Sequence, residues 1–389
     1  MRHLTFALLL LPALAMAQVR QGPPNAGFEP AFEGQTRAPA LDPTAVAIGT
    51  VASGLEHPWG IALLPDGSHL VTERPGRLRV VGPDGTLSPP VAGVPEVDDR
   101  GQGGLLDVAV RDDFAETRRL WLTYAKPLGD GLTVTAAGTG VLSANGTALE
   151  DWREIFVQDP PSRHPMHYGS RIAFEPGTGN LWITTGEHSA REDRDKAQDI
   201  GTTYGKIVRV DALTGAAPAD NPFVGRDGVD TIWSWGHRNV QGAAVAPDGT
   251  LWTLEHGPAG GDELNRPEPG RNYGWPVISY GVEYNGTSVG RGEAVREGME
   301  QPVYYWDPVI APGGMTFYDG SAFDWQGDIL ASGLAVRQLV RLRLQDGLVV
   351  GEERIDMPGR VRDVEVAPDG TVLILIDAAD GAILRVSPG

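Results

Sequence analysis

Six short polar or Trp/Gly-rich segments hold most of the residues in this chain that could do chemistry. They include a histidine, His167, which could act as a general base, and three arginines, Arg238, Arg360 and Arg362, which could hold an anion. Because guanidinium groups form paired hydrogen bonds with carboxylates, we expect a carboxylate-bearing ligand. The segments are His57-Pro58-Trp59, Gly101-Gln102-Gly103, His167-Tyr168, Gly236-His237-Arg238-Asn239, Ala311-Pro312-Gly313 and Arg360-Val361-Arg362.

Each segment comes directly before the first strand of a repeated unit. The unit is an apolar strand, a turn of the Pro-Asp-Gly type and a second apolar strand, a pattern typical of β-hairpins. Six copies predict an all-β fold, a six-bladed β-propeller over residues 45–389, in which neighbouring blades bury each other's faces. A β-sandwich is the alternative, and the longer gaps at 126–165 and 284–304 are expected to be loops. The copies begin at Gly60, Gly104, Ser170, Gly242, Gly314 and Asp363.

The shared register of the six segments predicts a single site. Equivalent positions in successive blades are related by rotation about the channel, so residues before the innermost strands should ring one of its mouths. Taken singly, each arginine could pair with a local carboxylate, and His167 could be an ordinary turn residue. A zinc site at His164 and His167 is not expected, because no third ligand is evident. The residues expected to converge are Gln102, His167, Arg238, Asn239, Arg360 and Arg362.

A second candidate site lies in the segment 255–276, which is rich in glycine, proline and carboxylates. Its backbone carbonyls and the Glu263 side chain could bind a hard cation such as calcium, which prefers oxygen ligands. Surface Asp-Gly turns bind nothing in most proteins, so this composition alone does not define a metal site.

The N-terminus predicts an exported protein. An apolar run ends in Ala15-Met16-Ala17, which indicates a signal peptide over 1–17 that is cleaved near Ala17. No later segment is long enough for a transmembrane helix, so we expect a soluble periplasmic or secreted protein with no integral membrane segment. Residues 18–44, rich in Pro, Gly and Ala, are predicted to form a flexible leader.

The composition excludes several kinds of chemistry and partner. The chain has no cysteine, which excludes disulfides, thiolate metal sites and a thiol nucleophile. Its formal net charge of −19 would repel nucleic acid and anionic membranes. An anionic ligand must therefore be held by a local basic cluster.

Nine segments, in order, cover most of the chain from Val51 to Val386, and their combination is highly specific. They are GQGGLLDVAVRDDF, HYGSRIAF, TTGEH, YGKIVRVD, DNPF, GHRNVQG, EHGPAGGDELN, NYGWPVISYG and RVRDVEVAPDG. In these segments the chain resembles the soluble pyrroloquinoline-quinone-dependent aldose dehydrogenases, also called the glucose/sorbosone dehydrogenase family.

The resemblance implies a reaction and a set of cofactor contacts. His167 would take the proton from the anomeric hydroxyl of an aldose sugar, hydride would pass to pyrroloquinoline quinone (PQQ), and the sugar would leave as a lactone. Electrons would then pass to an external acceptor, a quinone or a cytochrome. The residues implied to contact the cofactor or polarise its reactive carbonyl are Gln102, Arg238, Asn239, Arg360 and Arg362, with Gln102 and Arg238 in the catalytic set beside His167.

The resemblance also implies a calcium ion, which would act as a Lewis acid on the quinone oxygens. Its ligands would be the carbonyls of Gly257, Pro258 and Tyr273 and the side chain of Glu263. We expect the protein to be a monomer or a homodimer.

Two positions depart from the family pattern. Ala335 stands where many relatives have a cofactor-binding lysine, and Arg337 could substitute for that lysine, because strand residues two apart share a face. Met166 stands where some relatives have an acidic sugar contact, which predicts a loose or different substrate preference. Two other functions stay open: a calcium-stabilised propeller that binds sugars or proteins without catalysis, and a lactone or ester hydrolase that uses a metal-bound water.

Overall fold

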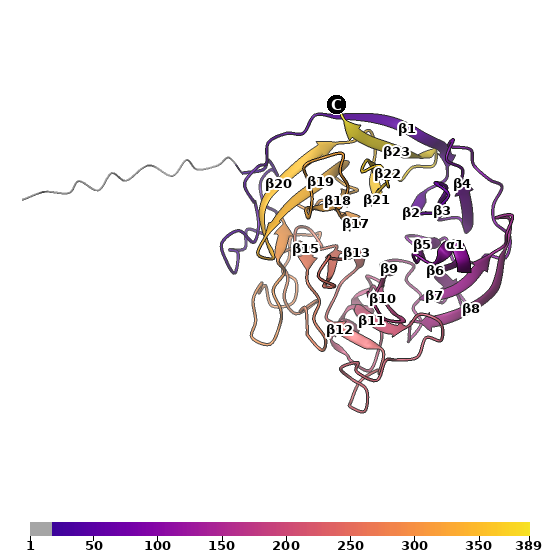
Figure 1. The fold of residues 1–389 in the computed structure, drawn as a ribbon. Coiled ribbons are helices and arrows are strands. Elements are labelled where there is room, and N and C mark those ends of the chain that lie inside the picture. The colour runs from indigo at the N-terminus through magenta and orange to yellow at the C-terminus, as the bar shows by residue number, and fades with distance from the viewer. Residues whose placement is uncertain (1–17) are drawn as a thin grey trace, which may run out of the picture.

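Residues 18–389, which this computed structural model describes, contain 23 strands in six sheets arranged around a central channel (Figure 1). The predicted signal peptide lies outside the described residues. Within residues 18–389, helical structure is limited to α1 (Phe114–Thr117), α2 (Arg191–Arg194) and the 3₁₀ turn η1 (Asp195–Gln198). The predicted all-β, six-bladed β-propeller is therefore confirmed.

The six blades follow the chain in order, and their strands are antiparallel. The first three blades are β2 (Pro58–Leu63), β3 (His69–Glu73) and β4 (Arg77–Val81); β5 (Leu105–Val110), β6 (Arg119–Pro127), β7 (Thr133–Leu142) and β8 (Leu149–Val157); and β9 (Gly169–Phe174), β10 (Asn180–Thr185), β11 (Lys206–Asp211) and β12 (Ile232–Trp235). The next two are β13 (Val240–Val245), β14 (Leu251–Glu255), β15 (Asp262–Asn265) and β16 (Tyr304–Trp306); and β17 (Pro312–Phe317), β18 (Ile329–Gly333), β19 (Gln338–Gln345) and β20 (Leu348–Asp356). The last is β21 (Val361–Val366), β22 (Val372–Ile376) and β23 (Gly381–Pro388), completed by β1 (Val46–Leu55).

The ring closes because the first strand of the chain joins the last blade. β1 pairs antiparallel with β23, from Val46 opposite Pro388 to Leu55 opposite Gly381. Figure 1 shows the indigo β1 lying against the yellow C-terminal strand. The hairpin repeat did not predict this pairing, because β1 precedes the first copy of the repeat.

The innermost strands are the first strands of the six predicted copies, and each contacts the inner strand of the next blade. Their Pro-Asp-Gly turns form as the residue types require: the Asp66 carboxylate accepts a hydrogen bond from the Ser68 amide (3.0 Å), and Gly67 has a φ of +83°. Every inner strand also has a register shift near its start. Such bulges redirect side chains at the rim of a sheet.

Residues 18–44, predicted as a flexible leader, instead pack on the fourth and fifth blades. Gln35 and Ala38 are buried, and Gln21 Nε2 donates to Glu352 Oε2 (3.1 Å). The Asp307 carboxylate accepts hydrogen bonds from two leader amides, those of Asn25 (2.7 Å) and Ala26 (2.9 Å). Side chains of the blades thus provide hydrogen bonds that the Pro- and Gly-rich segment cannot make within itself.

The expected loop over 126–165 is also wrong in large part, because β7 and β8 lie within it. The interval 284–304 contains no strand before β16 begins at Tyr304, as expected. None of the helices within residues 18–389 is long and apolar enough to cross a membrane.

A buried arginine joins the inner strands at mid-channel. Arg171 Nη1 on β9 donates to Asp107 of β5 (2.8 Å) and to Asp363 of β21 (3.0 Å). Arg171 Nε donates to the Gln241 carbonyl of β13 (3.0 Å), and its guanidinium lies 4.5 Å from the centroid of the Trp59 ring of β2. One side chain therefore holds inner strands of four other blades.

Close packing around this arginine explains one of the glycines of the repeat. A Cβ added at Gly314 would lie 1.6 Å from Asp363 Oδ1 and 3.0 Å from Arg171 Nη2. Any larger residue would therefore displace the ion pair.

Candidate functional site

The centre of the candidate site is a buried histidine that is paired with a carboxylate. His167 lies just before β9 with a φ of +45°, and its Nδ1 is 2.9 Å from Glu187 Oε1, which follows β10. Both side chains are almost fully buried. Because an ionised carboxylate can only accept a hydrogen bond, Nδ1 carries the proton and Nε2 is left with its lone pair.

The surroundings keep this imidazole neutral. Burial lowers the pKa of His167, the positive charge of Arg238 lowers it further, and Glu187 opposes both effects. Burial alone would raise the pKa of Glu187, but the hydrogen bond from His167 and the nearby positive charge outweigh the effect of burial. The pKa of Glu187 therefore lies below its usual value. The pair is therefore a neutral base beside an ionised carboxylate, the arrangement that general-base chemistry needs.

Two amide side chains fix the loops on either side of His167. Gln102 Oε1 accepts the His167 amide (2.9 Å), and Asn239 Oδ1 accepts the Gly169 amide (2.9 Å). Both amide oxygens are therefore used by backbone donors, and among residues 18–389 neither NH₂ group donates a hydrogen bond. The structure thus brings Gln102, His167 and Asn239 together from three successive blades, as predicted.

Arg238 borders the same centre with an incompletely satisfied guanidinium. Its Nη1 donates to the His256 carbonyl (3.2 Å) and its Nη2 to the Tyr284 hydroxyl (3.4 Å), whereas its buried Nε has no partner among residues 18–389. The group lies 5.1 Å from the Trp275 ring centroid. A buried N–H without a partner is costly, so this donor is suited to a ligand acceptor.

The other two predicted arginines meet at one carboxylate. Arg362 Nη2 lies 3.0 Å from Asp377 Oδ2, and Arg360 Nε lies 3.9 Å from the same oxygen. Arg362 Nη1 also donates to Gln241 Oε1 (2.9 Å), and its buried Nε has no partner in the described chain. Two positive groups thus share one negative partner, which leaves excess positive charge at this mouth.

Arg337 and Ala335 lie in the turn between β18 and β19, at the same end of the channel as Ala311. The Leu334 amide donates to the Ala311 carbonyl (2.9 Å), and the side chains of Ala335 and Arg337 are exposed. Within residues 18–389, no hydrogen bond or ion pair joins the Arg337 side chain to the other predicted residues. Its backbone φ of +56° breaks the strand geometry on which the shared-face prediction rested.

The predicted cation segment forms a small cavity beside Arg238. The cavity measures about 10 Å³, roughly the space of one water molecule, and Gly257, Glu263 and Tyr273 line it, with Pro258 next in the chain. Glu255 also lines it and lies directly opposite Glu263 on the paired strands β14 and β15.

The two facing carboxylates differ in how well they are satisfied. Glu255 accepts hydrogen bonds from His237 Nδ1 (2.9 Å), Asn265 Nδ2 (2.9 Å) and the Arg238 amide (2.7 Å). Glu263 accepts only from Asn265 (3.0 Å), and burial with the charge of Glu255 holds its pKa well above the usual range. Within residues 18–389 no three His, Cys, Asp or Glu side chains cluster to hold a metal. A cation here would rely on carbonyls and this carboxylate pair.

Four residues of the site were missed from the sequence: Glu187, Gln241, His256 and Asp377. His256 Nε2 lies 3.2 Å from Gln241 Oε1, which links the Arg238 and Arg362 sides of the mouth. Burial and the charges of Arg238 and His167 hold the pKa of His256 well below its usual value. Glu187, His256 and Asp377 follow the second strands of their blades, whereas the predicted residues come directly before the first strands.

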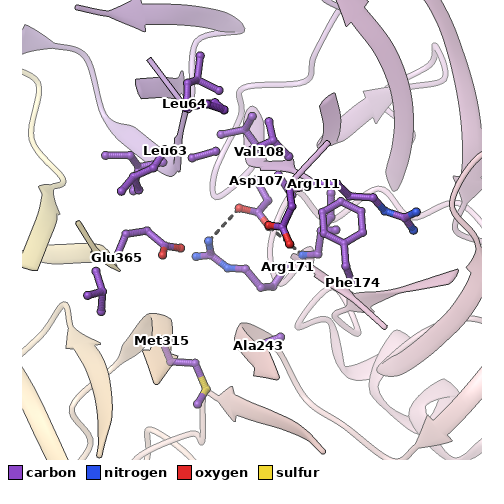
Figure 2. Close-up of a pocket in the computed structure, with 18 of the residues that line it drawn as sticks. Leu63, Leu64, Asp107, Val108, Arg111, Arg171, Phe174, Ala243, Met315 and Glu365 are labelled. Carbon is purple, nitrogen blue, oxygen red and sulfur yellow. Dashed lines mark hydrogen bonds and ion pairs between the residues drawn. The ribbon is translucent and has the colours of Figure 1, made fainter. Parts of the chain in front are cut away.

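A second cavity, of about 490 Å³, opens at the other end of the channel (Figure 2). Its lining comes from the far ends of the inner strands, including Leu64, Phe174 and Glu365, and Arg171 also lines it. Figure 2 shows Glu365 pointing toward the Arg171 guanidinium. Burial, with the charge of Asp363, raises the pKa of Glu365 to about 8.

This shift predicts a pH-dependent effect of replacing Glu365 with glutamine. In the unfolded chain the pKa of this carboxyl is near its ordinary value of 4.5, whereas the folded protein keeps the proton up to about pH 8. Wild-type stability therefore falls as pH rises through that window. We expect Glu365→Gln to be more stable than wild type by about 1–3 kcal/mol at pH 8.5 and nearly equal at pH 4.5. Denaturant titrations across this range measure the difference.

The control is Glu150→Gln, which neutralises an exposed glutamate on β8 and should leave the pH dependence unchanged. A gain from Glu365→Gln that does not vary with pH would contradict the assignment.

The fold and the site together define a β-propeller that carries, at one mouth of its channel, a buried histidine–carboxylate pair flanked by arginines. A family model described as Glucose / Sorbosone dehydrogenase matches residues 55–385. Aldose sugar dehydrogenase YliI of Escherichia coli (strain K12) is 41% identical over 354 residues, which cover 89% of this chain and 94% of that protein. The chain belongs to the glucose/sorbosone dehydrogenase family of oxidoreductases.

Solved structures agree with this membership. The soluble aldose sugar dehydrogenase of Escherichia coli, in its apo form, has a TM-score of 0.85 at 40% identity and covers 88% of this chain and 100% of its own. The PQQ-bound form of the aldose sugar dehydrogenase of Streptomyces coelicolor has a TM-score of 0.72 at 27% identity and covers 89% of this chain and 100% of its own.

Proposed function

We propose that this protein is a PQQ-dependent aldose sugar dehydrogenase that oxidises sugars at the anomeric carbon to lactones. The observation that carries this proposal is the buried His167–Glu187 pair, set among arginines whose Nε atoms lack partners. The PQQ-bound relative and the aldose sugar dehydrogenase from Escherichia coli support the same reaction class. We place the protein in the periplasm or outside the cell, with a quinone or a cytochrome as electron acceptor.

In this mechanism His167 Nε2 takes the proton from the anomeric hydroxyl. Glu187 holds the reactive tautomer and stabilises the imidazolium that forms, because its carboxylate lies 2.9 Å from Nδ1. A bound PQQ would supply the two-electron acceptor for the hydride that is lost from the anomeric carbon as the C–O bond gains double-bond character. The two electrons and the hydroxyl proton thus leave the sugar together, which gives the lactone.

The residues at the mouth fit an anionic, carboxylate-bearing cofactor. Arg362 and Arg360 supply positive charge that Asp377 only partly offsets. The free Nε of Arg238 and the amide NH₂ groups of Gln102 and Asn239 add donors from the neighbouring blades. Arg337 would reach the cofactor only by moving its side chain inward from the exposed turn.

The carboxylate pair beside this mouth fits a calcium ion. A cation in the small cavity would relieve the repulsion between Glu255 and Glu263, and the carbonyls of Gly257, Pro258 and Tyr273 would complete an oxygen ligand set. Because Arg238 also lines this cavity, a cation there would add to the positive potential at the cofactor mouth.

Reconstitution of the purified protein tests the proposal. Apo-protein is titrated with PQQ in the presence and absence of Ca²⁺, and dye reduction is followed with a panel of aldoses. We expect sugar-dependent reduction that requires PQQ and is lost when a chelator removes Ca²⁺.

Two outcomes would contradict this function. PQQ that fails to bind at micromolar concentration would favour the binding propeller and indicate that Ala335 represents a real loss. Ester or lactone hydrolysis that needs Ca²⁺ but no PQQ would favour the hydrolase.

A further inference from the structure

One aromatic side chain beside the candidate site is highly exposed to solvent. Tyr284 is 76% exposed, the highest value among the large hydrophobic residues of the described chain, and the next is Val295 at 53%. A single exposed aromatic is ordinary on a protein surface. Tyr284 differs because its hydroxyl lies 3.4 Å from Nη2 of Arg238, one of the arginines that border His167.

The segment that carries Tyr284 is held from two sides. The Ala259 amide donates to the Val282 carbonyl (2.9 Å) and the Val282 amide to the Ala259 carbonyl (3.0 Å), which ties the segment to the predicted cation loop. Glu283 Oε1 lies 2.8 Å from Arg194 Nη1 of α2. The two residues before Tyr284 are therefore held in place, whereas the ring itself is uncovered and its hydroxyl contacts only Arg238 among the described residues.

The contacts of Tyr284 lead back to the reaction centre. Arg238 and Arg194 both lie against the Trp275 ring, at 5.1 and 4.6 Å from its centroid. The charges of both arginines also lower the pKa of His167. The tyrosine thus borders the group of side chains that surrounds the proposed base, on the side that opens to solvent.

We propose that Tyr284 is a specificity-determining residue that forms the outer wall of the sugar subsite. Its ring face would pack on the C–H face of a cyclic aldose whose anomeric hydroxyl points to His167, while its hydroxyl stays on Arg238. An aromatic ring with a polar tip suits a ligand that has both an apolar face and hydroxyl groups. This inference rests on the proposed function and names the residue that holds the far side of the substrate.

Steady-state kinetics of Tyr284→Ala and Tyr284→Phe in the PQQ- and Ca²⁺-loaded enzyme test it. We expect Tyr284→Ala to raise KM for aldoses about five- to tenfold, with kcat within about twofold of wild type, because a stacking contact is lost while the base is untouched. Tyr284→Phe keeps the ring and should retain a KM within about twofold of wild type. PQQ affinity, from titration of the apo-protein, should be unchanged in both variants.

The matched control is Val295→Ala, which shortens the other strongly exposed apolar side chain of the same region and should leave KM unchanged. A wild-type KM in Tyr284→Ala would overturn the assignment. So would a joint fall of kcat and PQQ affinity in both tyrosine variants, since that would show a role in positioning Arg238. Wild-type enzyme that oxidises no aldose would overturn the proposed function itself, and this inference with it.

Discussion

Replacing His167 with alanine is expected to lower kcat by about 10²–10⁴-fold and to leave PQQ binding largely intact. The reason is that the imidazole is the neutral base at the centre of the site, whereas the positive charge that would hold the cofactor comes from Arg238, Arg360 and Arg362. The measurement is dye reduction at saturating sugar, alongside PQQ titration of the apo-protein. Wild-type turnover in this variant would remove the mechanism.

His164→Ala is the matched control. His164 lies three residues earlier, is 44% exposed and pairs with Glu192 at 2.9 Å, so its loss should change kcat by less than about twofold. A similar loss of activity in both histidine variants would indicate a general effect on this loop rather than removal of a base.

Glu187→Gln tests whether this carboxylate positions the base His167, because it removes the carboxylate charge and keeps the histidine. The carboxylate raises the pKa of His167, against burial and the charge of Arg238, so its neutralisation should lower that pKa further. Because protonation of His167 stops the reaction on the acid side, the acid limb of the pH–rate profile should move to lower pH while kcat falls. A purely structural role would lower activity without moving this limb.

Much of the site could be predicted because the fold repeats. Six hairpin copies in one chain define a rotation axis, so residues at a common register meet regardless of their separation in sequence. Gln102, His167, Arg238, Asn239 and Arg362 come together in this way. The first strand of each copy is enough to define this register, and the Pro-Asp-Gly turns mark that strand clearly.

The features that could not be predicted depend on contacts outside the repeat. β7 (Thr133–Leu142) is rich in Thr, Gly and Ala, so its apolar period is too weak to distinguish it from a loop. The leader is ordered by Asp307, which lies 282 residues after Asn25, and by Glu352, which lies 331 residues after Gln21. The prediction for Arg337 assumed that it shares a strand face with Ala335, whereas both residues lie in a turn. Composition and local period contain no information about such long-range partners.

Replacing Arg171 with methionine is expected to destabilise the fold by about 3–5 kcal/mol, the cost of leaving buried carboxylates without their counterion. Asp107 and Asp363 approach this guanidinium at 2.8 and 3.0 Å, and all three side chains are less than a tenth exposed. Denaturant unfolding of the apo-protein provides the measurement. Arg343→Ala, which removes a half-exposed arginine 3.8 Å from Asp328, is the matched control and should cost less than about 1 kcal/mol.

The origin of this loss can be tested by pH and by removing the carboxylates. Burial raises the pKa of Asp107 to about 6 although Arg171 opposes the shift, so without the arginine the folded protein should hold this proton to a higher pH. When the pKa of a carboxyl is higher in the folded protein than in the unfolded chain, the protein becomes less stable as pH increases. The loss of stability caused by Arg171→Met should therefore be smaller at pH 5 than at pH 8. Adding Asp107→Asn and Asp363→Asn keeps acceptors for the Ile172 and Ile61 amides but removes the unpaired charges. This triple variant should recover most of the lost stability. A loss of stability that does not depend on pH and that the two asparagines do not relieve would instead be due to lost packing against Trp59.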